Sequence, residues 1–593
     1  MVKSHYTNIS IREVGNVMKK LIAIFLTVSM IFSICAVSVS AATNEADLSF
    51  AVSADLHYKP HEETLEWFSE DPIYGYANRR AAMENESSLI IDEFLNQCAQ
   101  DDNIEFILIP GDLTNDGKVF LDDHKVVAEK LRKFEAETGK QVYVINGNHD
   151  VGMVGEYCET GIKEFVEVYY EFGYDEALTV IEGTGTYTAD LSDKYRLIAL
   201  DSCDPDKSTE DGMSDAEVEW VVKQAEAAYA DGKYPILMMH HNLLDHLPMQ
   251  RLLSHDFIIR NHQATAEKWA NAGIKLVFTG HEHCSDATSY TSTKGYVISD
   301  FATTSLTMYP LQYRYIEMRE DSIIYEAKTV DKIDTAALKA MVPDYSDEQL
   351  AEMDKGLNAF AKEFLKNGVE WRLERGFNDE QLGISPGDIY YDMVRDVVDG
   401  LNDVLNMPLY GEGSAQELAK QYGIDIPDSE YKDGWDVATE LVSAHYAGSE
   451  NYPLSGRDVR ILLLMVSLVL RNEFSVLNDM EITKFAEALI FAQGTGSFMG
   501  SITDFLGVDP DSITPIEYCA IALLSPLLIS FANDDGVDDN NGAIDGYGSN
   551  DTTGNILNNL GNTASDIFSY LMNILMYVLK AMGYTEVPLP FDI

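Results

Sequence analysis

The sequence predicts a layered α/β domain followed by a mainly α-helical C-terminal domain. Up to about Lys328, short apolar runs rich in β-branched residues alternate with segments of helical length. Strands that alternate with helices are typical of a layered α/β sheet. Beyond that point the strand-like runs give way to helical ones. We therefore expect the α/β domain at residues 45–330 and the helical domain at residues 334–593.

Five of the apolar runs lead directly into residues that commonly bind metals. The runs lie at 47–54, 106–109, 142–145, 236–239 and 275–278, with helices expected at 82–98, 124–136 and 215–230. The motifs that follow are Asp55-Leu56-His57, Gly111-Asp112, Gly147-Asn148-His149-Asp150, His240-His241 and Gly280-His281-Glu282-His283. In such sheets ligands gather at the carboxyl ends of the strands, so these motifs should converge.

The residue types of these motifs suit a pair of metal ions. Carboxylate oxygen, amide oxygen and imidazole nitrogen together favour Mn, Fe or Zn over Ca. No thiolate is needed, which argues against a structural zinc finger. A two-metal site about 3.5–4 Å across needs a bridging carboxylate, and Asp112 is the natural bridge. Glycines beside Asp112, Asn148 and His281 would let the backbone approach the metals closely.

Taken in order, the five motifs resemble those of the calcineurin-like metallophosphoesterases, over residues 47–328. Segments 111–117 and 240–244 are most similar to secreted bacterial members. The resemblance implies a sandwich of two sheets flanked by helices, and phosphoester hydrolysis with two divalent metal ions. It implies that one metal is held by Asp55, His57, Asp112 and His283, and the other by Asp112, Asn148, His240 and His281. It also implies that His149 acts on the leaving group from outside the metal shell and that Asp150 orients it.

One position departs from the purple acid phosphatases, which carry a Tyr three residues after the bridging Asp. Asn115 stands there in this sequence. The tyrosinate that stabilises ferric iron is therefore missing. This disfavours a purple, Fe(III)-dependent enzyme and favours divalent ions.

Further polar residues of the α/β region have less certain roles. His241 could bind metal or face the substrate. Asp201 could support the site or cap a turn. His124 is expected on the solvated face of a helix. Surface or rim positions are expected for four other histidines, His61, His246, His255 and His262.

The N-terminus has the form of a secretory signal peptide. Lys19 and Lys20 precede an apolar run that reaches Val39, and small residues follow up to Ala42. Met18 could be the true start. We expect residues 1–41 to be leader and signal peptide, and the product to be secreted or extracellular, with association with the cell surface left open. The apolar run at 461–470 is too short to span a membrane, so no transmembrane anchor is expected after signal cleavage.

The amino-acid composition limits the kinds of molecule that the protein is expected to bind. The 98 Asp and Glu against 42 Lys and Arg give a net charge of −56. This charge argues against stable nucleic-acid binding and against anionic membranes. Six cysteines, five of them after the signal peptide, are too sparse for a disulfide framework. A bridge between Cys203 and Cys284 stays open.

The C-terminal half shows helical patterns and no catalytic motif. Residues 346–349 have the form of a capping box before an amphipathic stretch that reaches Leu365. Other helices are expected at 388–405, 433–444, 455–477, 481–492 and 556–582. Segment 534–551 is expected to be a flexible acidic loop, with a calcium site as the less favoured alternative. We expect this half to be an accessory unit that shapes substrate access.

Two function classes follow from the sequence. The first is a secreted binuclear-metal phosphoesterase that hydrolyses phosphomonoesters or phosphodiesters through a metal-activated hydroxide. The alternative is a surface binding or adhesion protein that uses a degenerate phosphoesterase scaffold, because a fold can host many functions. The complete set of ligand candidates favours the enzyme. The substrate stays open among nucleotides, phospholipid head groups, sugar phosphates and wall polymers.

Overall fold

The computed structural model describes the chain over a set of ranges. They are residues 46–60, 81–152, 158–203, 213–246, 250, 255–320, 322–376, 386, 391–450, 456–473, 504–509, 512–513, 517, 521 and 538–545. The predicted signal peptide, His61 and the helices expected at 481–492 and 556–582 lie outside the described residues. The chain divides into two compact units. The α/β unit comprises the described residues within Thr43–Gly376, Thr439–Asn451 and Asn533–Ile593, and the helical unit those within Phe377–Ala438 and Tyr452–Ala532.

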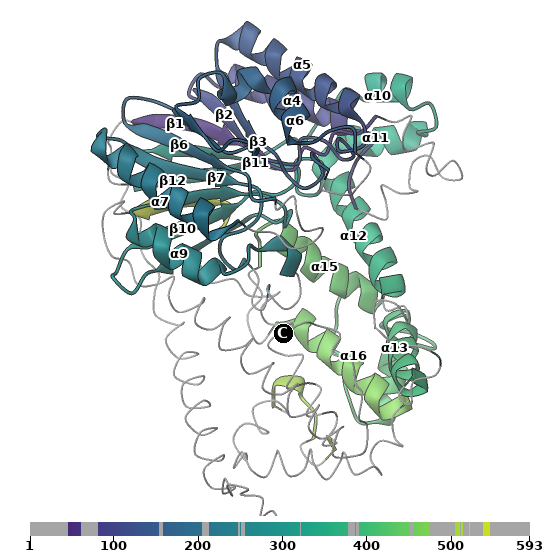
Figure 1. The fold of residues 1–593 in the computed structure, drawn as a ribbon. Coiled ribbons are helices and arrows are strands. Elements are labelled where there is room, and N and C mark those ends of the chain that lie inside the picture. Colours follow the sequence, from purple (N-terminus) through teal and green to yellow (C-terminus); the bar gives the residue numbers. More distant parts are fainter. Residues whose placement is uncertain are drawn as a thin grey trace, which may run out of the picture. The chain divides into compact units, whose positions relative to one another are not determined.

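Two mixed sheets form the α/β unit (Figure 1). The six-stranded sheet has the order β13-β12-β11-β1-β2-β3. Its strands are β1 (Leu48–Val52), β2 (Phe106–Pro110), β3 (Gln141–Ile145), β11 (Gln312–Met318), β12 (Ser322–Thr329) and β13 (Asn541–Asp545). Strands β1, β2 and β3 are parallel, whereas β11, β12 and β13 are added in antiparallel fashion.

The seven-stranded sheet has the order β4-β5-β6-β7-β8-β10-β9. Its strands are β4 (Thr179–Val180), β5 (Tyr187–Asp190), β6 (Tyr195–Leu200), β7 (Tyr234–Met239), β8 (Leu276–Thr279), β9 (Asp286–Thr291) and β10 (Val297–Ala302). Strands β6, β7, β8 and β10 are parallel. Each sheet therefore has a parallel block whose carboxyl ends can present ligands.

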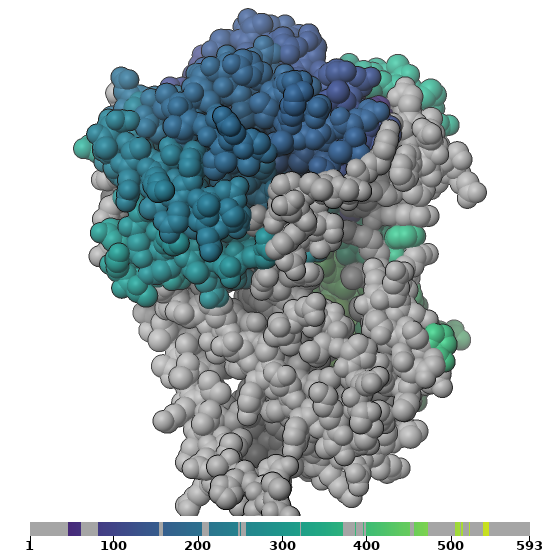
Figure 2. Space-filling view, in the orientation of Figure 1, coloured from purple at the N-terminus to yellow at the C-terminus, as the bar shows by residue number. Residues whose placement is uncertain are grey.

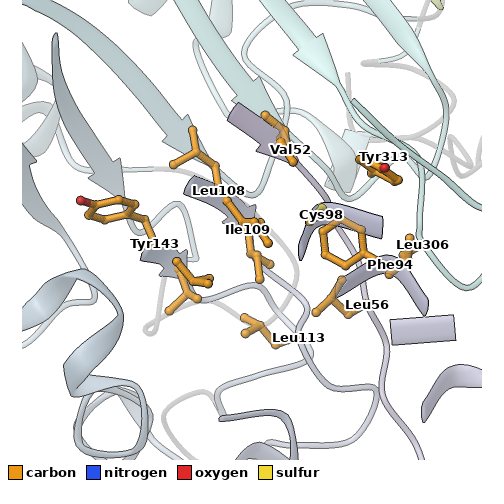
Figure 3. Packing of buried hydrophobic residues seen from close by; sticks show 14 of the residues in the cluster. Val52, Leu56, Phe94, Cys98, Leu108, Ile109, Leu113, Tyr143, Leu306 and Tyr313 are labelled. Atoms are coloured by element: carbon orange, nitrogen blue, oxygen red, sulfur yellow. The ribbon is translucent and has the colours of Figure 1, made fainter. Parts of the chain in front are cut away.

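Helices cover the outer faces of the sheets, and apolar side chains fill the space between them. Helices α4 (Ser87–Gln100) and α5 (Leu121–Thr138) lie on the six-stranded sheet, and α7 (Asp215–Ala230) and α9 (His262–Asn271) on the other (Figure 1). The rings of Phe50 and Phe278 meet between the sheets at 5.6 Å. Figure 3 shows part of the hydrophobic core, including Phe94 and Cys98 of α4. The blue to teal part of the chain forms one continuous surface in Figure 2.

Strand periodicity explains this layering. Leu197 and Ala199 of β6 join the core between the sheets. Ile198 and Leu200 join a second core that contains Val221 of α7 and Trp269 of α9. Successive side chains of a strand point to opposite faces, so a continuous apolar run is needed where both faces are buried. The predicted strands and helices of this region are confirmed.

The α/β unit extends beyond the predicted boundary at residue 330. It continues through α10 (Thr335–Met341), α11 (Asp347–Lys355) and α12 (Leu357–Gly376). Their buried residues, among them Leu338, Tyr345 and Phe364, belong to the same core as the strands. The capping box is confirmed at Ser346, but the expected single stretch to Leu365 is interrupted at Gly356. Whether residues 45–330 fold alone stays a prediction.

Two sequence-based expectations, on buried histidines and on the acidic loop, are corrected, and one question that the sequence left open is answered. His124, expected in solvent, is fully buried, and His246 and His262, expected at the surface or rim, are 7% and 8% exposed. The 541–545 part of the expected acidic loop is strand β13, which pairs with β12. Cys203 and Cys284 are both free thiols, so the bridge left open between them is absent.

The helical unit contains α13 (Tyr391–Leu405), α14 (Ala415–Gln421), α16 (Arg457–Glu473) and the residues of α15 (Gly434–Tyr446) up to Ala438. Three of these helices were predicted, and α14 was not. A buried ion pair joins Arg471 and Glu517 at 2.8 Å. Among the described residues no helix is both long enough and apolar enough to cross a membrane.

Candidate metal centre

The carboxyl ends of five strands bring the seven predicted ligands together. Asp55 and His57 follow β1, Asp112 follows β2 and Asn148 follows β3, all in the six-stranded sheet. His240 follows β7, and His281 and His283 follow β8, in the seven-stranded sheet. The site is thus assembled from both sheets.

One group of donor atoms surrounds the imidazole of His57. Its Nε2 lies 3.1 Å from Nε2 of His283. It lies 3.8 Å from Oδ1 of Asp55 and 3.7 Å from Oδ2 of Asp112. Nε2 of His283 is itself 3.3 Å from Asp55 Oδ1. These four side chains direct their donor atoms to one point.

A second group surrounds the imidazole of His240. Its Nε2 lies 3.0 Å from Oδ1 of Asn148 and 3.1 Å from Nδ1 of His281. It lies 3.3 Å from Oδ2 of Asp112. The same oxygen of Asp112 therefore faces both groups, which is the geometry that a bridging carboxylate requires.

Buried acceptor atoms around His240 indicate that this arrangement suits a cation. Nδ1 of His240 lies 2.9 Å from the carbonyl oxygen of Pro110, which can only accept, so Nδ1 carries the proton. In the neutral ring Nε2 then points a lone pair at the oxygens of Asn148 and Asp112. Asp55 Oδ1 and Asp112 Oδ2 are buried and accept no hydrogen bond from the described residues. Converging lone pairs of imidazole, carboxylate and amide suit divalent Mn, Fe or Zn.

Electrostatics keep Asp112 and His281 in forms that bind metal, whereas His240 would have to release a proton to an incoming ion. Burial raises the pKa of Asp112, but the charges of His240, His149 and His57 outweigh burial and hold that pKa well below its usual range. Burial lowers the pKa of His240, while Asp112 and Asp55 raise it to about 10. Burial and the neighbouring His241 and His240 hold the pKa of His281 well below its usual value. Asp112 is therefore ionised and His281 is neutral, as metal ligation requires.

Strained backbone accompanies the ligands. Left-handed φ values occur at Asp55 (51°), His57 (42°), Asp112 (50°), His281 (67°) and His283 (61°). For residues other than glycine this conformation costs of order 1–3 kcal/mol each and persists only where the surroundings enforce it. Such clustering is typical of functional sites.

The geometry of the turns depends on glycines that make room for ligand side chains. A Cβ on Gly147 would lie 2.2 Å from Asp112 Oδ1, and one on Gly280 would lie 2.3 Å from Asp55 Oδ2. A Cβ on Gly111, whose φ is +89°, would lie 2.7 Å from His240 Nδ1. The glycines were expected to let the backbone approach the metals. The structure shows that they make room for the side chains of the ligands.

His149 and Asp150 sit beside the ligands in different ways. The backbone N–H of His149 donates to Asp112 Oδ1 at 2.8 Å, and the ring is partly exposed. Its Nδ1 lies 2.6 Å from the carbonyl oxygen of Asn115. The buried carboxylate of Asp150 accepts from the backbone of Leu113, Thr114 and Gly147. The hydrogen-bond partner of His149 Nδ1 is thus the carbonyl oxygen of Asn115. Asp150 instead links the loop after β2 to the loop after β3.

Asp201 supports one of these loops. Its carboxylate accepts from Asn146 Nδ2 at 2.8 Å and from the backbone N–H of Gly185 at 3.0 Å. It also accepts from Cys203 N, as in a turn. Both roles left open from the sequence therefore apply.

Several residues that contact the metal ligands are not marked by any pattern in the sequence. His241 places its Nδ1 2.8 Å from Ser202 Oγ and forms a metal-compatible group with His240 and His281. The ring of Phe257 stacks on His281 at 4.5 Å. His283 Nδ1 lies 3.0 Å from the sulfur of Met308. Only the doublet His240-His241 could have indicated one of these residues from the sequence.

His124 also belongs to this surrounding shell. Its Nε2 lies 2.9 Å from the carbonyl oxygen of Asp150, and its Nδ1 lies 3.1 Å from the hydroxyl of Tyr169. Burial lowers its pKa to about 4. The neutral ring thereby joins α5 to the loop that carries Asn148.

Comparison with known proteins agrees with the motifs. Residues 48–285 match the family model of the calcineurin-like phosphoesterases. No curated protein matches the chain. A dimetal phosphatase from Danio rerio is 11% identical with a TM-score of 0.36, and the match covers 48% of this chain and 97% of that one. The structure of PhoD is 11% identical with a TM-score of 0.31, covering 48% and 66%. A predicted phosphoesterase from Streptococcus pneumoniae is 13% identical with a TM-score of 0.19, covering 49% and 91%.

These structural scores are too low to carry an argument, so the assignment rests on the family match and on the motifs within it. The matched residues contain all five motifs that meet at the strand ends. The resemblance predicted from the sequence is confirmed. Residues 48–285 are therefore similar to the calcineurin-like phosphoesterases.

Proposed function

We propose that the protein is a secreted binuclear-metal phosphoesterase. The observation that carries this proposal is the position of Asp112. Its buried Oδ2 lies 3.7 Å from His57 Nε2 on one side and 3.3 Å from His240 Nε2 on the other. A carboxylate oxygen shared by two groups of imidazole and oxygen donors is suited to bridge two cations.

The ligands of the two ions follow from these groups. Asp55, His57, Asp112 and His283 would hold one ion, and Asp112, Asn148, His240 and His281 the other. His241 is a further candidate for the second ion, since its ring lies 4.4 Å from that of His281. Divalent Mn, Fe or Zn suit this donor set. Asn115, in place of a tyrosine, favours divalent ions.

Two bound ions would supply a nucleophilic hydroxide and neutralise the charge of the reacting phosphoryl group. The chain's own groups would do the rest. His149 is partly exposed, its Nδ1 lies 2.6 Å from the carbonyl oxygen of Asn115, and it would donate a proton to the leaving oxygen. The net charge of −56 repels phosphate at long range, so binding of the phosphoester would depend on the local positive charge at the centre.

The substrate class and the compartment are parts of the same proposal. The centre would accept a phosphomonoester or a phosphodiester of a small or wall-associated molecule. Secretion is supported by the charged, apolar and small-residue segments of the first 42 residues. The acidic composition supports an exported protein without a stable nucleic-acid partner.

The test uses the full secreted chain. Elemental analysis after incubation with Mn or Zn should give two ions per chain. The loaded protein should hydrolyse p-nitrophenyl phosphate or bis(p-nitrophenyl) phosphate, and the ratio of the two rates would assign the monoester or diester preference. One ion or none at saturating metal would overturn the two-metal site. An inactive protein would favour the alternative of a binding protein on a degenerate scaffold.

A further inference from the structure

The loop that carries His281 and His283 is held from outside by residues distant in sequence. The backbone N–H of Ser285, two residues after His283, donates to the carbonyl oxygen of Tyr446 at 3.1 Å. The backbone N–H of Ala287 donates to Asp539 Oδ1 at 3.0 Å. Residues 446–448 and 538–541, which we call the C-terminal strap, all belong to the α/β unit.

Asn540 links the two parts of the strap to the loop. Its Nδ2 donates to the carbonyl oxygens of Ala447 at 2.7 Å and Gly448 at 2.9 Å. Its Oδ1 accepts from the hydroxyl of Ser285 at 3.1 Å. Gly448 packs so closely that a Cβ there would lie 2.3 Å from the carbonyl oxygen of Ser285. One amide side chain therefore joins its own segment to residues 447–448 and to the loop at Ser285.

A buried arginine fixes the same junction from the sheet. Arg314 of β11 is 1% exposed. It donates to the carbonyl oxygen of Asp539 at 2.5 Å and to the hydroxyl of Ser285 at 3.1 Å. It also donates to the carbonyl oxygens of Asp286 at 3.1 Å and Ala302 at 2.6 Å. Pairing of β13 with β12 anchors the strap at its other end.

These contacts bear on the metal centre because His281 and His283 have left-handed backbone. Such a conformation persists only where its surroundings over-determine it. The residues of β8 hold the loop before His281, and the strap holds it after His283. Without the strap, Ser285 and Ala287 would lose partners for two backbone N–H groups, and the strained turn would be free to relax.

We infer that the C-terminal strap completes the metal centre, with Asn540 as a positioning residue that acts on His283 through Ser285. This inference rests on the proposed function, since it concerns the affinity of the centre for metal. The coupling between the strap and metal binding is then reciprocal. If the strap favours metal binding, bound metal must stabilise the strap by the same free energy.

The test compares Asn540→Ala with Asn541→Ala in the full chain. Asn541 is adjacent and exposed, so it is a matched control. Competition with a chelator would measure the affinity for Zn or Mn. Loss of a group that orients a ligand typically weakens metal binding about 10- to 100-fold. We expect a loss of that size in Asn540→Ala and none in Asn541→Ala, with unchanged circular dichroism for both.

Hydrogen exchange gives a readout that does not depend on activity. In metal-free protein, the amides of Ser285 and Ala287 should exchange faster in Asn540→Ala than in wild type. In wild type, added metal should slow exchange in residues 541–545. Ser285→Ala removes the hydrogen bond between Ser285 Oγ and Asn540 Oδ1 from the side of the loop. This variant tests the inference if Asn540→Ala does not fold. The losses of the two single variants should not add in full in the double variant, because the two residues share the contact between Ser285 Oγ and Asn540 Oδ1.

The outcomes separate the inference from the proposed function. Wild-type protein that takes up no metal overturns the proposed function and, with it, the effect of the strap on metal. Wild-type protein that binds two ions, with Asn540→Ala and Ser285→Ala binding equally tightly, overturns the strap alone. Weaker metal binding in both variants, with the control unchanged, supports it.

Discussion

Nδ1 of His149 lies 2.6 Å from the carbonyl oxygen of Asn115, and the backbone N–H of the same histidine donates to Asp112. The carbonyl can only accept, so Nδ1 carries a proton and Nε2 is the atom that would exchange one with a substrate. The ring is therefore fixed by the loop after β2, next to the metal ligands.

His149→Ala tests this assignment. General acid–base groups typically contribute about 10²–10⁴-fold to the rate. We expect a decrease in turnover of that order on esters with poor leaving groups and a smaller decrease on p-nitrophenyl esters. Elemental analysis should still find two ions per chain. A variant that has lost its metal would show that His149 belongs to the metal shell.

Asp112→Asn tests the bridge. The substitution keeps the shape of the side chain but removes the charge that both groups of donors share. Substitution of a residue outside the metal shell typically weakens metal binding about 10- to 100-fold. We expect a larger loss of metal affinity in Asp112→Asn, with activity lost in parallel. Asp122→Asn is a suitable control, because its side chain is 89% exposed at the start of α5. Two ions retained in Asp112→Asn would contradict the bridging role.

Gly147→Ala tests whether the glycines make room for ligands. The new Cβ would lie 2.2 Å from Asp112 Oδ1 and 2.6 Å from Asp112 N, so the bridge must move. We expect reduced metal content together with reduced activity. Gly139→Ala, at φ +74° with no atom within 4 Å, should lower the melting temperature and leave metal content unchanged. Equal metal content in the two variants would argue against the steric role.

Much of the centre could be predicted because its information is local. Each ligand follows a continuous apolar run, and such runs identify buried strands with little help from tertiary structure. The parallel pairing of β1 and β2 then explains why Asp55 and Asp112 meet, whereas His240 reaches them from the other sheet. The family motifs supplied the division of ligands between two ions, which no periodicity could have given.

Other features of the structure could not be predicted from the sequence because they depend on tertiary packing. His124 lies on a helix with many charged neighbours, and only its contacts with Asp150 and Tyr169 show that it is buried. Strand β13 is five residues long and lies in a segment rich in Asp, Asn and Gly, which disfavour strands. It forms because the edge of β12 offers backbone partners. The strap on Ser285 joins residues more than 150 positions apart and has no signature in the sequence.

Glu86→Gln tests a buried carboxyl away from the centre. Burial raises the pKa of Glu86 to about 7, and the hydroxyl of Tyr345 donates to it. The folded pKa exceeds the unfolded value near 4.5, so the folded state binds more protons between pH 4.5 and 7. Stability from this group is therefore present below pH 4.5 and is lost as the pH rises to 7.

Glutamine imitates the protonated carboxyl at every pH. We expect Glu86→Gln to match wild type near pH 4.5 and to be more stable at pH 8 by up to about 3 kcal/mol, because the pKa of Glu86 rises from 4.5 to about 7 on folding. Urea unfolding of the metal-free proteins at both pH values would measure this. Glu137→Gln, on the exposed side of α5, is the control and should show no such difference. A constant difference between wild type and Glu86→Gln at the two pH values would contradict the prediction.

A chain that ends near Asp331 tests the predicted domain boundary. If residues 45–330 were an independent domain, the shortened protein would bind metal and melt cooperatively. The packing of the α/β unit predicts the opposite. The truncation removes Leu338, Tyr345 and Phe364 from the main core, and it removes strand β13 and the strap. Large core losses cost several kcal/mol each, against a total stability of about 5–15 kcal/mol.

We therefore expect the shortened chain to lack a cooperative transition in circular dichroism and to bind metal weakly or not at all. A chain that ends at residue 376 is the informative companion, because it restores the core helices α10–α12 but not the strap. It should regain cooperative melting while its metal affinity stays below that of the full chain. A cooperative transition and two tightly bound ions in the chain that ends near Asp331 would restore the boundary at 330 and argue against the strap.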